Sequence, residues 1–381
     1  MYSSRASATC SKQWARLLSD IPATRTNAPV LLAIESSCDE TAAAVISEDG
    51  QILSNVVSSQ QELHAAWGGV VPEIASRAHV SRILPCVKSA LVQADVATAD
   101  LAAVAVTSEP GLVGSLLVGL TAAKTLAMSL RIPLVTVNHI DAHIYACGIG
   151  RTESIFPCVG FVVSGGHTNL YSCDSATEFR MIGGTTDDAA GEAFDKVARI
   201  LGLPYPGGPS VSAAAESGDR KSIPMPRPML KKPGLDFSFS GLKTAVLYAA
   251  RGLPGESQLK TTPRERVPDL AASFQEAVVD VLVRKAERAL KQTRLTRLCV
   301  GGGVAANRRL RTRLQQMCDL KGAELLIAAP EYCTDNAAMA AIAWEYLKQG
   351  KTSNLDVDVL PGLIRRPAPH TKNSRRFQPK N

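Results

Sequence analysis

The chain has 381 residues, of which 45% are hydrophobic and 5% aromatic, and it carries a net charge of +7. This length predicts about two domains, and the composition is typical of a globular α/β protein. No apolar run approaches the roughly 18 residues of a membrane span, and no signal-peptide core opens the chain, so we expect no membrane association. The nine cysteines form no C-x-x-C pair, which favours reduced thiols and a cytoplasmic location.

The positive charge is concentrated at the two ends of the chain. Residues 1–28 carry +3 and residues 362–381 carry +6, which leaves −2 for the rest. We interpret residues 1–28 as a disordered N-terminal extension, with a mitochondrial or plastid transit peptide as the alternative. The basic C-terminal tail, 362–381, is expected to attract a polyanionic partner, unless it only aids solubility.

Regular structure is predicted to begin at Val30. Apolar stretches separated by polar turns predict a β-meander, with strands at 30–34, 41–46 and 52–57. Helices and strands then alternate, with helices at 76–93 and 113–130 and strands at 102–107 and 134–138.

A second meander begins with strands at 158–163 and 168–172. An α/β series follows it. Helices are predicted at 188–201, 209–216 and 267–293, another begins at residue 306, and a last one covers 336–347. Strands are predicted at 298–300 and 324–328. The repeated order predicts an α/β fold of two ribonuclease-H-like lobes with a nucleotide cleft between them. We expect residues 29–150, with the helix 336–347, to form the N-terminal lobe and residues 151–335 the C-terminal lobe.

Two histidines, His139 and His143, are spaced to project from one face of a helix, as paired imidazole ligands do. Two surface histidines without a metal would show the same spacing. Ile140 stands where the zinc-protease motif H-E-x-x-H requires glutamate, which disfavours a metalloprotease. Asp335 precedes a predicted helix and is either its N-cap or a third metal ligand. Two histidines and one carboxylate suit iron(II) or zinc.

Glycine-rich turns stand next to several predicted strands and helices. The turn 164–167 joins two apolar strands, and its backbone N–H groups could bind a phosphate, although a hairpin needs glycine anyway. Gly208 lies in a turn that opens a helix, and the glycines 301–303 follow a buried strand. Asp195 lies on one face of a predicted helix, where its spacing is equally typical of a solvated surface.

Longer motifs run through the chain in a fixed order. They include I-E-S-S-C-D-E-T at 34–41, G-G-V-V-P-E at 68–73, V-S-G-G-H-T at 163–168, D-D-A-A-G-E-A-F-D-K at 187–196, F-S-F-S-G-L-K-T at 237–244 and C-T-D-N at 333–336. With these motifs and the histidine pair, residues 31–347 resemble the bacterial-type tRNA N6-adenosine threonylcarbamoyltransferases, formerly labelled O-sialoglycoprotein endopeptidases.

The resemblance implies the actin/Hsp70/sugar-kinase superfold. It implies an Fe(2+) ion, with Zn(2+) as the alternative, held by His139, His143 and Asp335. It also implies that threonylcarbamoyl-AMP is bound by Val162, Val163, Ser164, Gly165, Gly166, Asp195, Gly208 and Asn307.

The reaction that the resemblance implies moves the threonylcarbamoyl group from AMP to N6 of the adenosine immediately 3′ of the anticodon, in tRNAs that read codons beginning with A. An exocyclic adenine amine is a poor nucleophile, because its lone pair is delocalised into the ring. We therefore take Asp39 or Glu40, in the turn of the first meander, as the candidate base for the N6 proton.

The resemblance further implies partners: tRNA, and either a shorter inactive paralogue with a P-loop ATPase or, in organellar types, a second copy of the chain. A sugar or acid kinase of the same superfold would need no histidine pair, and a non-catalytic scaffold would tolerate its loss. Glu109 departs from the family, whose members carry glycine there, and we expect it to affect partner contacts or tRNA access. If the basic tail does not bind tRNA, we expect tRNA to bind a partner subunit or a basic cluster in the core of the chain. This cluster consists of Arg308, Arg309, Arg311 and Arg313.

Overall fold

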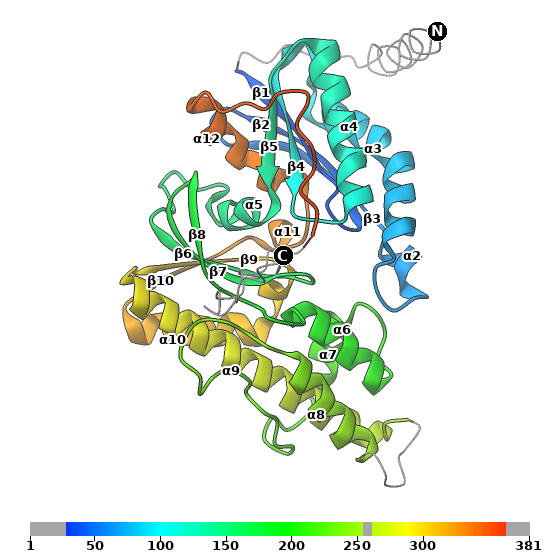
Figure 1. The fold of residues 1–381 in the computed structure, drawn as a ribbon, viewed down its shortest axis with the longest axis vertical. Coiled ribbons are helices and arrows are strands. Elements are labelled where there is room, and N and C mark those ends of the chain that lie inside the picture. The colour runs from blue at the N-terminus through cyan, green and yellow to red at the C-terminus, as the bar shows by residue number, and fades with distance from the viewer. Residues whose placement is uncertain (1–27, 254–260, 363–381) are drawn as a thin grey trace, which may run out of the picture.

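The protein is built from two lobes stacked along its long axis (Figure 1). The computed structural model describes residues 28–253 and 261–362. The predicted N-terminal extension and basic tail therefore lie almost wholly outside the described residues. Each lobe contains one five-stranded sheet.

The sheet of the N-terminal lobe has the strand order β3-β2-β1-β4-β5. Its strands are β1 (Val30–Glu35), β2 (Glu40–Ser47), β3 (Ile52–Ser59), β4 (Leu101–Glu109) and β5 (Leu134–Asn138). The first three strands run antiparallel, as the predicted meander requires, whereas β4 pairs parallel with β1, and β5 parallel with β4. Every residue of β1 is buried, because both faces of this central strand are covered.

Alternate residues of β1 enter two different cores. Leu32 and Ile34 pack with the helices α3 (Pro72–Ala94) and α4 (Val113–Leu130), and a short helix, α2 (Gln61–Ala65), precedes α3. Leu31 and Ala33 pack on the opposite face with the core that continues into the other lobe. This two-residue period places the two sets of side chains on opposite sides of the sheet.

Helix α4 corrects one expectation from the sequence. It is long and apolar enough, by length and composition alone, to cross a membrane. In the fold it is a core helix of the lobe, since Leu116, Leu120 and Leu126 are buried against the strands and α3.

The sheet of the C-terminal lobe has the order β10-β9-β6-β7-β8, which repeats the topology of the first sheet. Its strands are β6 (Cys158–Val163), β7 (Thr168–Ser175), β8 (Glu178–Gly184), β9 (Arg297–Gly301) and β10 (Glu324–Ile327). β8 completes the second meander and was not predicted. Its first residues alternate between exposed and half-buried positions, so the strand lacks a continuous apolar run.

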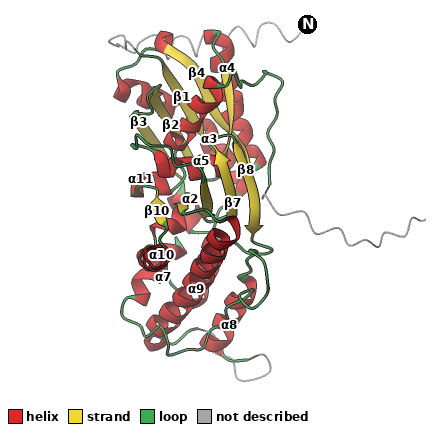
Figure 2. Cartoon of the chain, turned by 90° about the vertical axis from the view of Figure 1, so that its left-hand side faces the viewer, coloured by secondary structure: helices red, strands yellow, loops and turns green. Residues whose placement is uncertain are grey.

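The helices of the C-terminal lobe lie beyond its sheet (Figure 2). They are α6 (Ala190–Leu201), α7 (Gly207–Ala215), α8 (Ser240–Arg251), α9 (Val267–Thr293) and α10 (Arg308–Lys321). The long helix α9 is buried on all sides in its first half, and it packs through Phe274 against Phe194 of α6. Helix α8, within the predicted F-S-F-S-G motif, was not predicted.

The end of the chain returns to the N-terminal lobe. After α11 (Pro330–Cys333), the 3-10 helix η5 (Ala337–Ile342) and α12 (Ala343–Lys348) lie on the first sheet (Figure 1). The indole N–H of Trp344 donates a hydrogen bond to the carbonyl of Ile46 in β2. This return carries Asp335, between α11 and η5, to the boundary of the two lobes.

Candidate metal centre and ligand cleft

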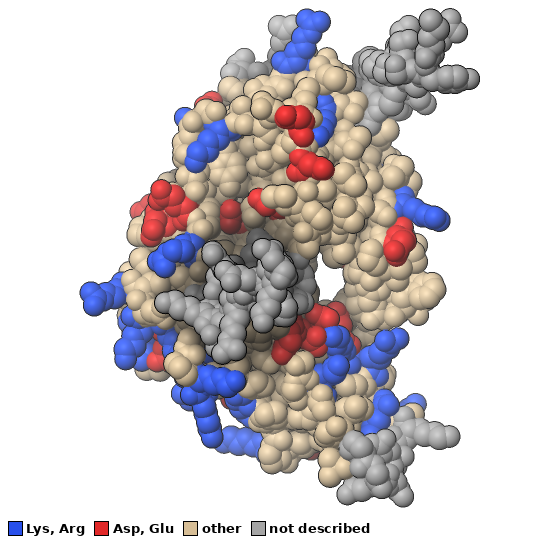
Figure 3. Space-filling model, in the orientation of Figure 1, with Lys and Arg blue, Asp and Glu red and all other residues tan. Residues whose placement is uncertain are grey.

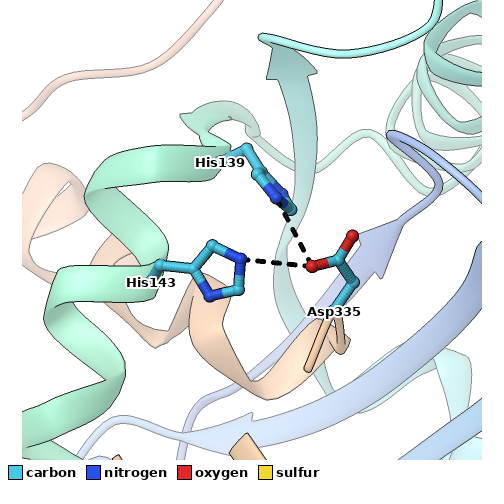
Figure 4. Close-up of side chains that lie close together, drawn as sticks. All are labelled: His139, His143 and Asp335. Atoms are coloured by element: carbon cyan, nitrogen blue, oxygen red, sulfur yellow. Dashed lines mark hydrogen bonds and ion pairs between the residues drawn. The ribbon is translucent and has the colours of Figure 1, made fainter. Parts of the chain in front are cut away.

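Three side chains converge at the junction of the lobes (Figure 4). The Nε2 atoms of His139 and His143 lie 3.5 Å and 3.1 Å from Oδ1 of Asp335. One ligand atom from each residue can be chosen so that all three lie within 4.8 Å of one another. The two histidines are buried, so the alternative of two surface histidines is wrong.

Local structure explains how the histidines are held. They lie on α5 (His139–Tyr145), which starts directly after β5. The side chain of Asn138 caps this helix by accepting hydrogen bonds from the backbone N–H groups of Ile140 and Asp141. One helical turn separates the two imidazoles, so both reach Asp335 from the same helix face.

Glu35, the last residue of β1, orients the first histidine. Its Oε2 lies 3.3 Å from Nδ1 of His139, and its Oε1 accepts a hydrogen bond of 2.6 Å from the N–H of Ser37. The hydroxyl of Thr107 donates to the same carboxylate. A buried carboxylate behind a histidine is the usual arrangement around a bound metal, because it fixes the orientation of the ring.

The electrostatics of the cluster suit a cation. Burial and the neighbouring His139 lower the pKa of His143, so this ring is neutral and can donate a lone pair. Burial would lower the pKa of His139 too, but Asp335 and Glu35 raise it to about 9. Burial alone would raise the pKa of Asp335, yet the histidines hold it below its usual range. Two imidazoles and an ionised carboxylate are a donor set for iron(II) or zinc.

His167 joins this cluster and was not predicted as a site residue. Its ring centroid lies 6.2 Å from that of His139, and only 8% of the residue is exposed. Its buried Nε2 has no hydrogen-bond partner among the described residues. Burial, together with His139 and His143, lowers the pKa of His167 to about 3. A neutral imidazole with an unpaired nitrogen is suited to contact a bound ligand.

The glycine turn that precedes His167 leaves its backbone open. Gly165 and Gly166 are exposed, and a Cβ atom added to Gly165 would meet nothing within 4 Å. Val162, Val163 and Ser164 are buried, because they end β6 and start the turn. The turn thus presents bare backbone beside the metal ligands, as an anion site requires.

Asp195 lies on α6 and holds the second glycine turn. Its Oδ1 accepts a hydrogen bond of 2.7 Å from the N–H of Gly207. Burial, with a contribution from Asp39 of the other lobe, raises the pKa of Asp195 to about 6. Nothing lies within 4 Å of a Cβ added at Gly208, so this backbone is also open.

Asn307 links three helices through its side chain. Its Oδ1 caps α10 by accepting from the N–H of Leu310, and its Nδ2 donates to Ser212 of α7 and Gln275 of α9. The side-chain amide therefore has a structural role, and a ligand approaching it has only the remaining acceptor capacity of Oδ1.

Two of the four arginines of the proposed core cluster are paired with carboxylates. Arg309 and Arg313 pair with Glu276 of α9, and Arg313 also pairs with Asp280. The guanidinium of Arg311 donates to the backbone carbonyls of Ala305 and Ala328. These contacts argue against this cluster as the main tRNA surface. The basic tail lies outside the described residues, so its binding of tRNA stays a prediction.

The two candidate bases lie in the turn between β1 and β2. The carbonyl of Asp39 accepts a hydrogen bond from Gln60, and Oε1 of Glu40 accepts one from Ser59. Burial, with Asp39 and Asp335 nearby, raises the pKa of Glu40 to about 10. This direction disfavours Glu40 as a base, so we take Asp39 as the candidate.

Glu109 does not lie in the turn region of the cleft. It ends β4, where it pairs with Asn138 of β5, and it is half-buried. Burial and the charge of Glu109 raise the pKa of Asp141, on the helix of the metal ligands, to about 7. Glu109 thus lies close to the helix that carries His139 and His143, and its effect on partner contacts or tRNA access stays a prediction.

Comparison with known proteins decides the family. Residues 51–342 match the family model described as tRNA N6-adenosine threonylcarbamoyltransferase. The chain belongs to this family. The tRNA N6-adenosine threonylcarbamoyltransferase of Rhodopirellula baltica is 53% identical over 349 residues, which are 88% of this chain and 97% of that relative. That of Geobacillus thermodenitrificans is 52% identical over 335 residues, covering 87% and 96% of the two chains. The chain is accordingly an acyltransferase that forms threonylcarbamoyladenosine in tRNA.

Solved structures agree on the fold. Full-length HypF in its phosphate- and nucleotide-bound form aligns with a TM-score of 0.58 at 16% identity, covering 87% of this chain and 58% of that chain. Component A of the Acidaminococcus fermentans (R)-2-hydroxyglutaryl-CoA dehydratase aligns with a TM-score of 0.50 at 13% identity, covering 84% and 99%. These likenesses confirm the predicted two-lobed superfold, and at such identities they show the fold alone.

Proposed function

We propose that the acyl donor is threonylcarbamoyl-AMP and that it binds between the two lobes, spanning the metal ligands and the turn 164–167. The observation that carries this proposal is the position of His167. It joins an open glycine turn to the histidine–aspartate cluster, and its buried Nε2 has no partner among the described residues. In this donor the carbamoyl carbon is bonded to a phosphate oxygen, so the phosphate can meet the glycine turn while the adjoining carbamoyl group lies at the histidine–aspartate cluster.

The transfer follows from the residues on the two sides of the cleft. N6 of the adenosine attacks the carbamoyl carbon, the bond from this carbon to the phosphate oxygen breaks, and AMP leaves with the electron pair. Asp39 accepts the N6 proton. The N–H groups of Gly165 and Gly166 stabilise the charge that develops on the departing phosphate.

The metal that best fits the two histidines and Asp335 is iron(II), with zinc as the alternative. When bound, such an ion supplies Lewis acidity toward the carbamoyl oxygen. Glu35 keeps the ring of His139 oriented through its Nδ1, so that Nε2 points toward Asp335 and would be available to a metal ion. His167 donates from Nε2 to the donor and holds it beside the ligands.

The partners we propose are those of the bacterial system, a shorter inactive paralogue and a P-loop ATPase. Support comes from the outer face of the N-terminal lobe, where α3 and α4 lie side by side (Figure 1). Val80, Val92, Val113 and Leu117 are exposed on these helices. An apolar helical surface of this kind favours a protein partner.

A cytoplasmic location is proposed from the thiols. The eight cysteines within the described residues are all free, which suits a reducing compartment. The alternative of an organellar transit peptide concerns residues 1–28, nearly all of them outside the described residues.

The test of this function uses the purified full-length protein and its metal site. We expect wild type to contain about one iron or zinc ion per chain and to form threonylcarbamoyladenosine on a tRNA transcript when given threonylcarbamoyl-AMP. The double variant His139→Ala/His143→Ala should lose the metal and the product, whereas Asp335→Asn should lose less metal, since an amide oxygen still coordinates. Full metal occupancy in the double variant, measured by elemental analysis, would show that the site is misassigned.

A further inference from the structure

The loop between α2 and α3 carries the most exposed aromatic residue of the described chain. Trp67 is 60% exposed, and Leu63, one helical turn before it, is 43% exposed. The other described tryptophan, Trp344, is buried and hydrogen-bonded. A large aromatic surface left in water next to a second apolar residue indicates a binding surface.

The loop is held in place by its own backbone. The N–H groups of Trp67 and Gly68 both donate to the carbonyl of His64, and Nδ1 of His64 accepts from the N–H of Val71. His64 is fully buried, and Gly68 takes a left-handed conformation with φ of 67°. The indole is therefore presented by a braced turn, which lowers the entropy lost when a ligand stacks on it.

Two contacts place this loop at the entrance to the cleft. On one side, Gln60, immediately before α2, donates its N–H to the carbonyl of Asp39, the proposed base. On the other side, a Cβ added at Gly68 would lie 3.7 Å from Nε of Arg199. Arg199 lies on α6 of the other lobe, one helical turn after Asp195. The loop thus spans from the proposed base to the helix that carries Asp195.

The surroundings are open and carry charges of both signs. Arg199 is exposed and forms no ion pair within 28–253 and 261–362. Figure 3 shows an opening between the two lobes, with basic side chains beside the acidic ones on its lower border. Asp188 and Glu192 both form ion pairs with Lys196, three residues before Arg199.

We propose that Leu63, Trp67 and Arg199 form a docking surface for the single-stranded anticodon loop of the tRNA substrate. A nucleotide next to the target adenosine stacks on the Trp67 indole, and Arg199 contacts a neighbouring phosphate. Proteins hold unpaired nucleotides in this way, with aromatic faces for the bases and a cation for the backbone. The proposal rests on the proposed function above and assigns a location to its acceptor.

The experiment titrates a metal-loaded full-length protein with an anticodon stem–loop RNA and follows tryptophan fluorescence. We expect the RNA to quench wild type and to quench Trp67→Phe much less, because the phenylalanine side chain does not emit at tryptophan wavelengths. Trp67→Ala should bind the RNA about tenfold more weakly, in the range of one lost stacking contact, whereas Trp67→Phe should stay near wild type. Arg199→Gln should reduce the slope of log affinity against log salt by about 0.7.

Controls separate this surface from the catalytic site. Leu320, on α10, is 84% exposed, and Leu320→Ala should change nothing. Metal content and binding of threonylcarbamoyl-AMP should be equal in wild type and Trp67→Ala. Equal RNA affinity of wild type and Trp67→Ala would overturn the proposal that this surface binds RNA. The proposal would also be overturned if Trp67→Ala weakened only the binding of a protein partner. Failure of wild type to use threonylcarbamoyl-AMP, with RNA binding still dependent on Trp67, would instead count against the proposed donor.

Discussion

The two sheets of this protein contain equivalent turns with different chemistry. β1 and β6 each have six residues, β2 and β7 each have eight, and a four-residue turn joins each pair. In the N-terminal lobe the strand ends in Glu35 and the turn in Asp39, whereas in the C-terminal lobe the corresponding residues are Val163 and His167. One turn supplies carboxylates, and the other supplies open backbone and a neutral imidazole.

The difference follows from what each turn faces. The first turn lies beside the cationic centre, where Glu35 contacts His139. The second turn lies where an anion would bind, and there a side chain at Gly165 would occupy the open space. A duplicated fold thus contains two matching loops, one carrying the proposed base and the other the proposed anion site.

The largest expected effect comes from the acidic turn. Asp39→Asn removes the proposed proton acceptor, and the rate of transfer should fall by about 10²–10⁴-fold, as for loss of a general base. Glu40→Gln is the matched control, because burial and the nearby Asp39 and Asp335 raise the pKa of Glu40 to about 10 and keep it protonated. Single-turnover assays with saturating donor measure both. A larger loss in Glu40→Gln than in Asp39→Asn would reverse the assignment.

A smaller effect is expected at the strand end that precedes this turn. Glu35→Gln should weaken metal binding about 10–100-fold, as loss of a carboxylate behind a ligating histidine does. Because Asp335 and Glu35 overcome burial and raise the pKa of His139 to about 9, a proton must leave this ring before it ligates. The metal affinity of wild type should therefore rise between pH 7 and pH 9 and level off above pH 9.

Glu35→Gln should also shift the pH at which metal affinity levels off. Without the charge of Glu35, the pKa of His139 falls, so affinity should level off at a lower pH. Thr107→Val, which removes a hydrogen bond to Glu35 but keeps its charge, serves as the control. Chelator competition at several pH values measures these affinities, and a flat profile in wild type between pH 7 and 9 is incompatible with a protonated His139.

The smallest effect is expected in the glycine turn. Gly165→Ala fits without a clash, yet its methyl group occupies the open side of the turn. AMP should bind about two- to tenfold more weakly, as for loss of one hydrogen bond, while metal affinity stays unchanged. Gly241→Ala, another exposed glycine with free space around it, is the control. Isothermal titration calorimetry measures AMP binding by the two variants. Equal AMP affinity of Gly165→Ala and Gly241→Ala would show that this turn is not the anion site.

The sequence predicted most of the framework because its apolar runs are long. The predicted bounds of α4, β5, β6 and α9 agree with the structure. β8 was missed because Glu178 and Arg180 interrupt its apolar pattern. The short α2 is too brief to be distinguished from a loop, whereas α8 carries a signal that was overlooked, since Leu242, Val246 and Ala250 recur every four residues and are buried.

The sequence predicted that His139, His143 and Asp335 act together, and the structure brings them into one cluster, but the residues that support this cluster were not predicted. His139 and His143 are close in sequence, whereas Glu35 is 104 residues from the histidine that it orients. No local pattern reports such a contact. A charged residue at the end of the buried run 30–34 was the available signal for Glu35, and the histidine that closes the glycine turn was the signal for His167.

The late position of Asp335 has a consequence for how the protein is made. A nascent chain completes the first sheet and both histidines long before η5 and α12 leave the ribosome. Until then the carbonyl of Ile46 lacks its indole partner and the apolar face formed by Leu31 and Ala33 lacks the helices that cover it. Since domains fold largely in the order of their synthesis, the first lobe waits in an unfinished state. The three side chains of the candidate metal centre therefore come together only after nearly the whole chain has been translated.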